Sequence, residues 1–208
     1  MSLLKEVERY YDAKVLRHGP TAGGVDWNSS ASQTLRFEQL LKIIDRSSFF
    51  TINDYGCGYG ALADHLAGKR RSFGYRGFDI SARMISSAKQ LHGGLKRLRF
   101  FTDGSSLAPA DYTVSSGIFN VKLKTPEKEW REYACRTLRH MDKLSIKGFA
   151  FNFLTVYSDK ERRRRDLYYA DPRFYFDFCK KNFSRDVALL HDYGLYEFTM
   201  LVRKHGAG

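Results

Sequence analysis

One glycine-rich stretch, residues 51–60, most constrains how this chain can fold. Apolar residues that suit a β-strand precede the glycines, and residues 61–67 after them suit a helix. Between these two elements the glycines stand at alternate positions, as Gly56, Gly58 and Gly60. Because glycine lacks a side chain, such a turn lets the backbone approach a ligand closely, and the start of the following helix offers unpaired N–H groups. The stretch therefore predicts a strand–turn–helix cradle for a ligand.

The spacing of these glycines distinguishes two kinds of cradle. The dinucleotide-binding fingerprint reads G-x-G-x-x-G. This chain instead has G-x-G-x-G, with Asp54 two residues before the first glycine. The run Asp-Tyr-Gly-Cys-Gly-Tyr-Gly, residues 54–60, resembles motif I of the class I S-adenosylmethionine-dependent methyltransferases. The alternatives are an ordinary tight turn and a nicotinamide-binding turn. The resemblance implies that five residues contact S-adenosylmethionine: Asp54, Gly56, Cys57, Gly58 and Gly60.

An acidic residue follows the glycine turn at the sequence spacing expected of a ribose-binding carboxylate. Residues 72–80 predict a second strand that ends at Asp79, 19 positions after Gly60. A carboxylate about 20 residues beyond such a turn can accept two hydrogen bonds from a ribose diol. Residues 77–81, Gly-Phe-Asp-Ile-Ser, also resemble the methyltransferase family, which carries an acid here for that purpose. The resemblance adds Ile80 and Met84 as cofactor contacts; a helix cap is the alternative role for Asp79.

Two further strand ends carry polar residues. Residues 97–104 predict a third strand ending in Asp103 and Gly104. In the resembling family an acidic or polar residue here commonly bonds the adenine amino group; capping of a turn is the alternative. Residues 111–120 predict a fourth strand and a loop at the position of motif IV. We expect Ser116 and Gly117 at the cofactor and Asn120 at the acceptor. The Asn/Asp-Pro-Pro-Tyr signature of amino-methylating nucleic-acid enzymes is absent from this loop.

Residues 1–32 are expected to form a helix and a loop that cap the domain. Apolar spacing predicts a helix over residues 3–16, and glycines and a proline mark the following loop, where Trp27 is an acceptor-contact candidate. Ser30 to Gln33 fit a capping box at the start of the next helix. In the resembling family this helix contributes polar groups to the methionine end of the cofactor, so Gln33 and Arg36 are candidates. The alternatives are a tryptophan that anchors the loop and a solvated helix face.

The segment of residues 157–173 interrupts the α/β alternation. Ser158 to Glu161 fit a second capping box, and four consecutive arginines, residues 162–165, follow it. Because ligands of open α/β sheets lie beyond the carboxyl ends of the strands, we expect this insertion to border the acceptor site. Tyr168 and Tyr169 would then face the acceptor. The alternative is a solvated helix whose arginines pair with nearby acids.

The remaining elements complete the predicted fold. Residues 125–127 predict a helix start, with a cap and a proline at the first helical position, and residues 148–154 predict a strand buried on both faces. An aromatic helix over residues 172–182 and a closing hairpin follow. The fold class is thus α/β: a Rossmann-like, doubly wound, mostly parallel sheet of seven strands with a C-terminal antiparallel hairpin. We expect residues 1–208 to form a single methyltransferase domain.

Composition limits the classes of function. The chain of 208 residues is 43% hydrophobic, enough for a full core. Because its apolar runs fall short of the ~18 residues of a membrane span and no signal-peptide pattern opens the chain, we expect a cytoplasmic protein without membrane contact. Its three cysteines are widely spaced, which indicates neither a disulfide framework nor a metal site. The net charge of +12 leaves nucleic acid possible as a partner.

These observations predict methyl transfer from S-adenosylmethionine to an acceptor, with a small molecule favoured. Two alternatives stay open: an RNA or ribosome methyltransferase, favoured by the charge and the four arginines, and a non-catalytic module that binds the cofactor. The sequence assigns no catalytic residue and no oligomeric state. In-line transfer from a sulfonium depends mainly on positioning and desolvation, so no catalytic dyad is required.

Overall fold

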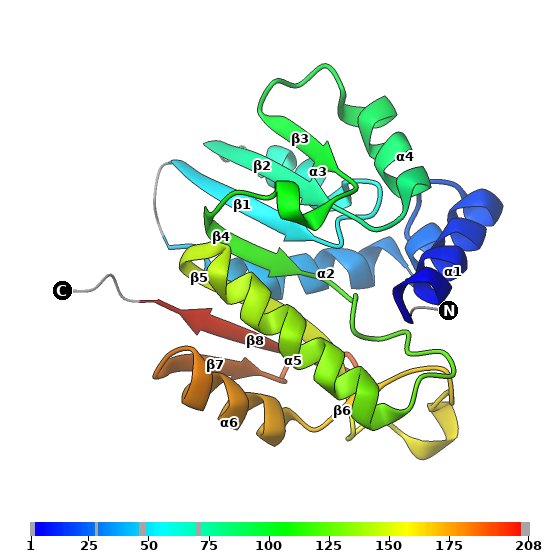
Figure 1. The fold of residues 1–208 in the computed structure, drawn as a ribbon, viewed down its shortest axis with the longest axis vertical. Helices are drawn as coiled ribbons and strands as arrows, with labels where there is room; N and C mark the ends of the chain where they lie inside the picture. Colours follow the sequence, from blue (N-terminus) through cyan, green and yellow to red (C-terminus); the bar gives the residue numbers. More distant parts are fainter. Residues whose placement is uncertain (1–2, 28, 46–48, 70–71, 205–208) are drawn as a thin grey trace.

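The structure, a computed structural model, describes residues 3–27, 29–45, 49–69 and 72–204. Its centre is one sheet with the strand order β3-β2-β1-β4-β5-β8-β7 (Figure 1). The strands of this path are β1 Phe49–Tyr55, β2 Ser72–Phe78, β3 Leu98–Phe101, β4 Ala110–Ser115, β5 Ser145–Thr155, β7 Asp186–Leu190 and β8 Glu197–Arg203. All neighbours are parallel except β8, which runs antiparallel to β5 and β7. The predicted seven-stranded sheet and closing hairpin are confirmed, and a two-residue strand, β6 Tyr169–Ala170, adds to β5.

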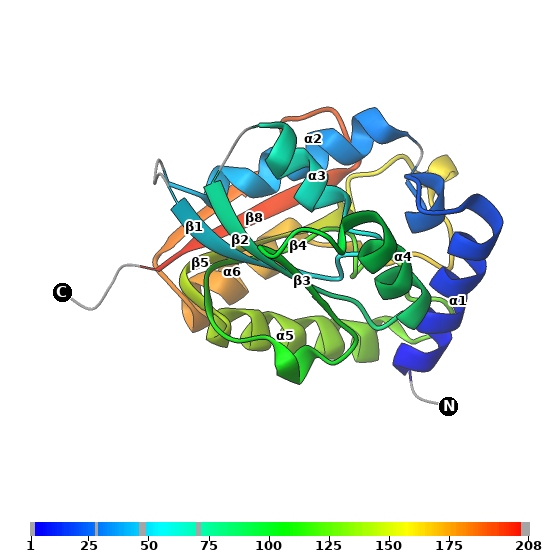
Figure 2. The same ribbon diagram turned by 90° about the horizontal axis from the view of Figure 1, so that it is seen from above.

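Helices cover both faces of the sheet. They are α1 Leu3–His18, α2 Ser30–Leu40, α3 Ala61–Gly68, α4 Ala82–His92, α5 Glu127–Lys143 and α6 Pro172–Asn182. Figure 2 shows α2 and α3 on one face and α5 on the other. The chain leaves β1 toward β2 and β3 on one side, whereas β4 leads to β5 on the other. The strand order therefore reverses between β1 and β4, which is where doubly wound sheets form their ligand crevice.

The side chains of β5 show how one strand serves two cores. Phe149, Phe151 and Phe153 pack with α5 and α6 residues such as Trp130 and Tyr175 in one cluster. Ala150, between two of those phenylalanines, packs in the opposite cluster with residues of α2, α3 and α4. Because successive side chains of a strand point to opposite faces, a strand covered on both sides needs the continuous apolar run seen here.

Two capping predictions were wrong in position or in kind. The cap of α2 is Ser29, whose side chain accepts a hydrogen bond from the Ser32 N–H, so the helix is capped one residue earlier than predicted. Ser158 caps no helix, because its hydroxyl donates to the Thr155 carbonyl instead. The residues after it form only a single 3₁₀ turn, Lys160–Arg162, so the α-helix that the capping box and the alternative interpretation implied is absent from this described segment.

Helix α1 lies beyond the carboxyl ends of β1 and β4 (Figure 1). It packs against α4 and against the short 3₁₀ turn Gly23–Val25. Val7 and Val15 are its buried residues, which fits the predicted amphipathic helix. In the ranges that the structure describes, no helix combines the length and the apolar character needed to cross a membrane.

Candidate functional site

The glycine turn connects β1 to α3 in a conformation that favours glycine. Gly56, Gly58 and Gly60 have φ of 88°, 53° and 90°, all in the left-handed region. A Cβ atom at Gly56 would lie 2.1 Å from Ile118 Cγ2, so a side chain would also collide with the loop after β4. The N–H groups of Gly56 and Cys57 donate to the Phe78 carbonyl at 2.7 and 2.9 Å. The turn is therefore fixed against the end of β2.

Asp79 follows β2 and reaches back to the glycine turn. Its Oδ2 accepts a hydrogen bond from the Gly58 N–H at 2.9 Å, and its Oδ1 accepts one from the Ser81 N–H at 2.9 Å. Burial raises the pKa of Asp79 to about 6, although both N–H groups favour the ionised form. A carboxylate has further lone pairs, so Asp79 can still accept hydrogen bonds from a ligand.

Asp54 forms the floor of the same region. It is buried, with 3% of its surface exposed, and its Oδ2 accepts a hydrogen bond from the Tyr75 hydroxyl at 2.7 Å. Burial raises the pKa of Asp54 to about 7, and the nearby charge of Asp79 adds to the shift. Two acids with raised pKa values at the switch point of the sheet are typical of a ligand site.

A cavity opens between the glycine turn, Asp54 and Asp79, and we name it the first cavity. It is lined by ten of the residues that the sequence assigned to a site: Trp27, Asp54, Gly56, Cys57, Gly58, Asp79, Ile80, Met84, Ser116 and Gly117. Gln33 of α2 also lines it, and its side-chain oxygen accepts a hydrogen bond from the Tyr59 hydroxyl at 3.2 Å. Gly60 is not among the lining residues; its place is structural, since a Cβ there would lie 2.9 Å from His92 Nε2.

The cover of the first cavity comes from the N-terminal part of the chain. Val7 and Tyr11 of α1 and Val25 of the following turn line the cavity with Trp27. The Ser81 hydroxyl, next to Asp79, donates to Asp12 Oδ1 at 2.5 Å, which ties α1 to the start of α4. The sequence predicted a cap over residues 1–32, but helical spacing alone could not identify Val7 and Tyr11 as the residues that reach the cavity.

A second cavity adjoins the first through shared walls. Tyr11, Val25, Trp27 and Gly117 line both. The additional walls of the second cavity are Asp26, Arg36, Asn120, Val121, Leu154, Ser158, Arg162, Arg164, Leu167, Tyr169, Tyr196 and Glu197. Arg36, expected at the cofactor, thus lines the second cavity and not the first. Asn120 and Tyr169, expected at the acceptor, line the second cavity as well.

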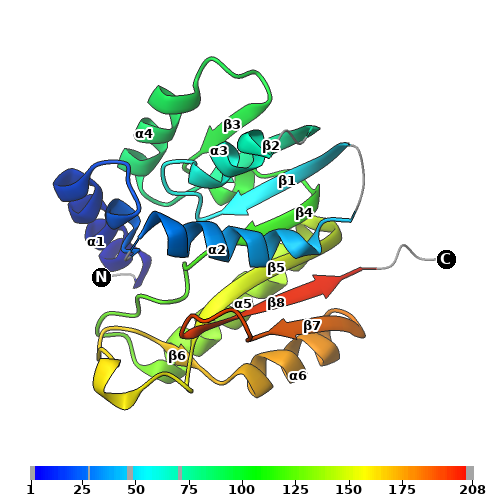
Figure 3. The same ribbon diagram turned by 180° about the vertical axis from the view of Figure 1, so that it is seen from behind.

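A buried polar chain runs behind both cavities. Arg36 bonds Glu197 through Nε and Nη2, the latter at 2.5 Å from Oε1. Asn152 of β5 donates to Glu197 Oε2 at 2.8 Å, and its Oδ1 accepts from the Gly117 N–H at 2.8 Å. Figure 3 shows α2 across β5 and β8, which lets Arg36 reach the first residue of β8. Asn152 and Glu197 were not predicted as site residues, although a polar residue inside the apolar run of β5 is a recognisable signal in the sequence.

Besides Gly60, three predicted site residues line neither cavity: Asp103, Gly104 and Tyr168. Asp103 is exposed and caps the turn Gly104–Ser106, since its oxygens accept hydrogen bonds from the N–H and hydroxyl of Ser105 at 2.9 and 2.6 Å. Neither Asp103 nor Gly104 lines the first cavity. Tyr168 points into the core, where its hydroxyl lies 3.2 Å from that of Tyr175. The adenine role of Asp103 and the inward-facing role of Tyr168 are therefore not supported by their positions.

The four arginines of residues 162–165 differ in their partners and in the cavities that they line. Arg162 lies 3.8 Å from Asp159, and Arg164 pairs with Asp166 at 2.5 Å. Arg163 donates to the carbonyl groups of Ser158 and Val156. Arg162 and Arg164 line the second cavity, whereas Arg163 and Arg165 line an adjoining depression that shares Arg164 with it. The expected pairing with acids is seen at Arg162 and Arg164, but on an irregular segment.

Comparison with known proteins adds an independent line of support. No protein-family model matches the chain. A protein of Mycobacterium tuberculosis named as a methyltransferase, Rv1506c, is 48% identical over 164 residues, covering 79% of this chain and 99% of that protein. This degree of identity over nearly the whole relative indicates common ancestry.

Solved structures share the fold at low identity. The N-methyltransferase NodS from Bradyrhizobium japonicum, in complex with S-adenosylhomocysteine, has a TM-score of 0.66 at 15% identity, over 94% of this chain and 97% of that chain. The magnesium protoporphyrin IX methyltransferase of Synechocystis, with bound S-adenosylhomocysteine, has a TM-score of 0.55 at 17% identity, over 98% and 85%. With the motif I glycine turn, the placed Asp79 and the mycobacterial relative, these comparisons show that the chain belongs to the class I S-adenosylmethionine-dependent methyltransferases.

Proposed function

We propose that this protein transfers the methyl group of S-adenosylmethionine to a small-molecule acceptor. The first cavity holds the cofactor and the second holds the acceptor. The observation that carries this proposal is the contiguity of the two cavities, which share Trp27 and Gly117 as walls. A methyl donor and its acceptor must meet in line at short distance, and adjoining cavities supply that arrangement.

The residues of the first cavity fit the cofactor. The glycine turn brings backbone close to the ligand, and Asp79 offers a carboxylate to a ribose diol. Ser116 Oγ is buried and has no hydrogen-bond partner among the described residues, so it is ready to bond a polar group of the ligand. Ile80 and Met84 add apolar surface. When bound, S-adenosylmethionine supplies an activated methyl group on a sulfonium.

The contributions of the protein are positioning and exclusion of water. Val7, Tyr11 and Val25 cover the first cavity, and Trp27 stands between it and the second cavity. Largely apolar walls of this kind keep water from competing with the acceptor and strengthen the electrostatic interactions inside. We assign no general base. Residues 1–32 are the proposed cap, residues 157–173 the proposed acceptor wall, and the whole chain the proposed single domain.

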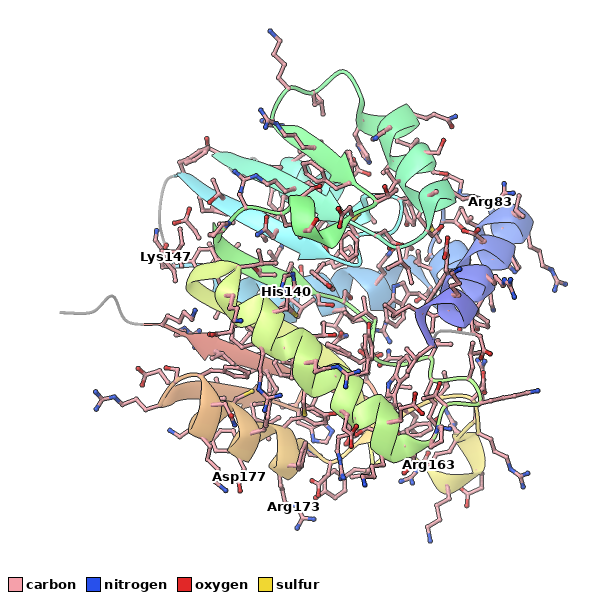
Figure 4. The ribbon with its side chains drawn as sticks, in the orientation of Figure 1. Arg83, His140, Lys147, Arg163, Arg173 and Asp177 are labelled. Carbon is pink, nitrogen blue, oxygen red and sulfur yellow. The ribbon has the colours of Figure 1, made fainter. Side chains whose placement is uncertain are left out.

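A small acceptor is favoured over RNA by the distribution of basic side chains. Figure 4 shows Arg83, Lys147 and Arg173 at separate edges of the molecule. Arg162 and Arg164 line the second cavity, but both are paired with neighbouring acids. Scattered cations supply a weak general attraction for polyanions, whereas an RNA-binding surface concentrates them along a track.

The test is calorimetry followed by methyl transfer. The protein should bind S-adenosylmethionine and S-adenosylhomocysteine and should not bind NAD. Incubation with methyl-labelled cofactor and separate pools of small metabolites and RNA should place label in the metabolite pool. Binding of NAD alone would overturn the cofactor assignment, label in RNA would overturn the acceptor class, and binding without transfer to any pool would favour a non-catalytic module.

A further inference from the structure

The guanidinium of Arg36 is buried and only partly bonded. Arg36 is 7% exposed. Its Nε lies 2.9 and 2.8 Å from the two Glu197 oxygens, and its Nη2 lies 2.5 Å from Oε1. The remaining nitrogen, Nη1, has no hydrogen-bond partner within the described ranges of the chain. A buried donor left without a partner is unfavourable, so its presence here points to a ligand atom that it bonds.

The position of Arg36 indicates whether this ligand is the cofactor or the acceptor. Gln33 and Arg36 are neighbours on one face of α2, yet Gln33 lines the first cavity and Arg36 lines the second. The guanidinium carbon of Arg36 lies 3.9 Å from the centre of the Trp27 ring, and Trp27 borders both cavities. Arg36 thus stacks on the ring that borders both cavities and is itself part of the wall of the second.

The charges of the second cavity favour an anionic ligand. Its walls carry three guanidinium groups, from Arg36, Arg162 and Arg164, and two carboxylates. Both carboxylates are already bonded. Glu197 accepts hydrogen bonds from Arg36 and Asn152, and Asp26 accepts them from the Tyr10 hydroxyl at 2.7 Å and from Lys14 at 2.5 Å. Arg162 and Arg164 are paired with Asp159 and Asp166. Arg36, whose Nη1 has no partner among the described residues, is therefore the guanidinium through which this cavity can bind an anion.

The rest of the second cavity suits an apolar or aromatic body. Trp27, Tyr169 and Tyr196 supply aromatic surface, and Leu154 and Leu167 supply aliphatic surface. An anion without such a body would leave this surface in contact with water, whereas an aromatic ring would bury it. The cavity therefore combines one polar anchor with an apolar wall, as small-molecule sites commonly do.

We propose that the methyl acceptor carries an oxyanion, such as a carboxylate, phosphate or sulfate, on an aromatic or apolar body, and that Arg36 Nη1 binds this oxyanion. Arg164, which pairs with Asp166, lines the same cavity. The inference rests on the proposed function, because it takes the second cavity as the acceptor site. It replaces the expectation that Arg36 holds the methionine end of the cofactor.

The experiment uses the full chain saturated with S-adenosylhomocysteine. Four probes are titrated by calorimetry and followed by tryptophan fluorescence: benzoate, phenyl phosphate, inorganic phosphate and the neutral benzyl alcohol. Benzoate or phenyl phosphate should bind at least about tenfold more tightly than benzyl alcohol, since a charged hydrogen bond adds on the order of 1.4 kcal/mol. Inorganic phosphate should bind weakly. The better of the two aromatic anions identifies the oxyanion, and equal binding of benzoate and benzyl alcohol would overturn the proposal.

Substitutions test whether Arg36 is the residue that binds the oxyanion. Arg36→Lys should lower the affinity for the preferred aromatic anion at least about tenfold and leave that for S-adenosylhomocysteine within about twofold. Arg164→Gln changes a half-exposed side chain and should lower the affinity for the preferred aromatic anion about threefold. This variant replaces Arg36→Lys in the test if Arg36→Lys does not fold. Arg185→Gln removes one exposed positive charge away from both cavities and should change neither affinity.

The outcomes separate this inference from the proposed function. Arg36→Lys with weakened S-adenosylhomocysteine and unchanged anion affinity would overturn the inference and return Arg36 to the cofactor. Anion affinity unchanged in both Arg36→Lys and Arg164→Gln would also overturn it. Failure of the unmodified protein to bind S-adenosylhomocysteine would instead count against the proposed function, and the preference for the aromatic anion over benzyl alcohol would still be measured on the unliganded chain.

Discussion

Replacement of Asp79 by Asn tests the centre of the cofactor site. In the structure the two carboxylate oxygens accept hydrogen bonds from the Gly58 and Ser81 N–H groups, each at 2.9 Å. Asn has the same size but only one acceptor oxygen, so its NH₂ group must face one of those N–H groups or turn toward the ligand. The substitution therefore removes the charge and one side of the proposed ribose contact without creating a cavity.

The expected loss of affinity follows from the hydrogen bonds involved. A hydrogen bond to a charged group contributes about 1.5–3 kcal/mol, and the amide oxygen retains part of the interaction. We therefore expect Asp79→Asn to bind S-adenosylhomocysteine with a loss of about 2–3 kcal/mol, or roughly 30- to 150-fold, at pH 7.5. The free energy of unfolding should change little, because the variant loses one backbone hydrogen bond but no longer buries a charge.

Ionisation of Asp79 should make both the stability of the protein and its affinity for S-adenosylhomocysteine depend on pH. Burial raises the pKa of Asp79 from 3.8 to about 6. Between these values the folded state holds the proton more tightly than the unfolded chain, so the unliganded protein should lose stability as pH rises through 6. Affinity for S-adenosylhomocysteine should move the other way, since the ionised carboxylate is the better acceptor for ribose hydroxyls.

Calorimetry between pH 5 and pH 8 on both proteins is the measurement. The affinity of the unmodified protein should rise around pH 6, and Asp79→Asn should lack that component of the rise. Asp103→Asn makes the same chemical change at an exposed acid outside the first cavity and should keep full affinity. An unchanged dissociation constant in Asp79→Asn, or a native affinity that falls as pH rises, would refute the reasoning.

Four other substitutions test the geometry. Gly58→Val should abolish S-adenosylhomocysteine binding, because φ is +53° and a Cβ would lie 3.0 Å from Val25 Cγ1; Gly68→Ala, with open space around it, is the calorimetric control. Tyr168→Ala should lower the free energy of unfolding, measured in urea, by about 3 kcal/mol, because Tyr168 packs in the core. Tyr169→Ala should leave the free energy of unfolding unchanged and reduce turnover, because Tyr169 lines the second cavity. Glu197→Ala should lower the free energy of unfolding by about 3–5 kcal/mol in the same assay, because it leaves the buried Arg36 charge without its partner. Equal stabilities of the two tyrosine variants, or a native-like Glu197→Ala, would contradict these assignments.

The sequence was most informative where structure is local. The glycine turn and Asp79 were predictable because both follow strands by fixed short distances, and parallel strands bring their carboxyl ends to the same edge of a sheet. Asp103 follows the end of β3 at Phe101, and its carboxylate accepts hydrogen bonds from the N–H and hydroxyl of Ser105, so the structure shows it as a turn cap and its adenine role stays a prediction. A cap and a ligand contact have the same sequence signature, so only the three-dimensional position separates them.

The tyrosine pair shows a second limit. Tyr168 and Tyr169 are adjacent in an extended segment, where neighbouring side chains point to opposite sides. The pairing of β6 with β5 fixes the parity: Tyr168 packs in the core and Tyr169 lines the second cavity. Composition and spacing contain no information on that register, so the sequence could assign the pair to the acceptor wall but could not separate its members.

The polar chain behind the cavities was beyond sequence reasoning for a different reason. Arg36 and Glu197 are 161 positions apart, and only the packing of α2 across β8 brings them together. Asn152 extends this pair to the Gly117 N–H, and a Cβ at Gly117 would lie 2.4 Å from Trp27 Cη2. Gly117 therefore holds the loop after β4 and receives the indole that divides the two cavities. Asn152 thus joins the Arg36–Glu197 pair to Gly117, a wall that both cavities share. The same buried chain that stabilises the cavities thus provides a direct physical connection between them.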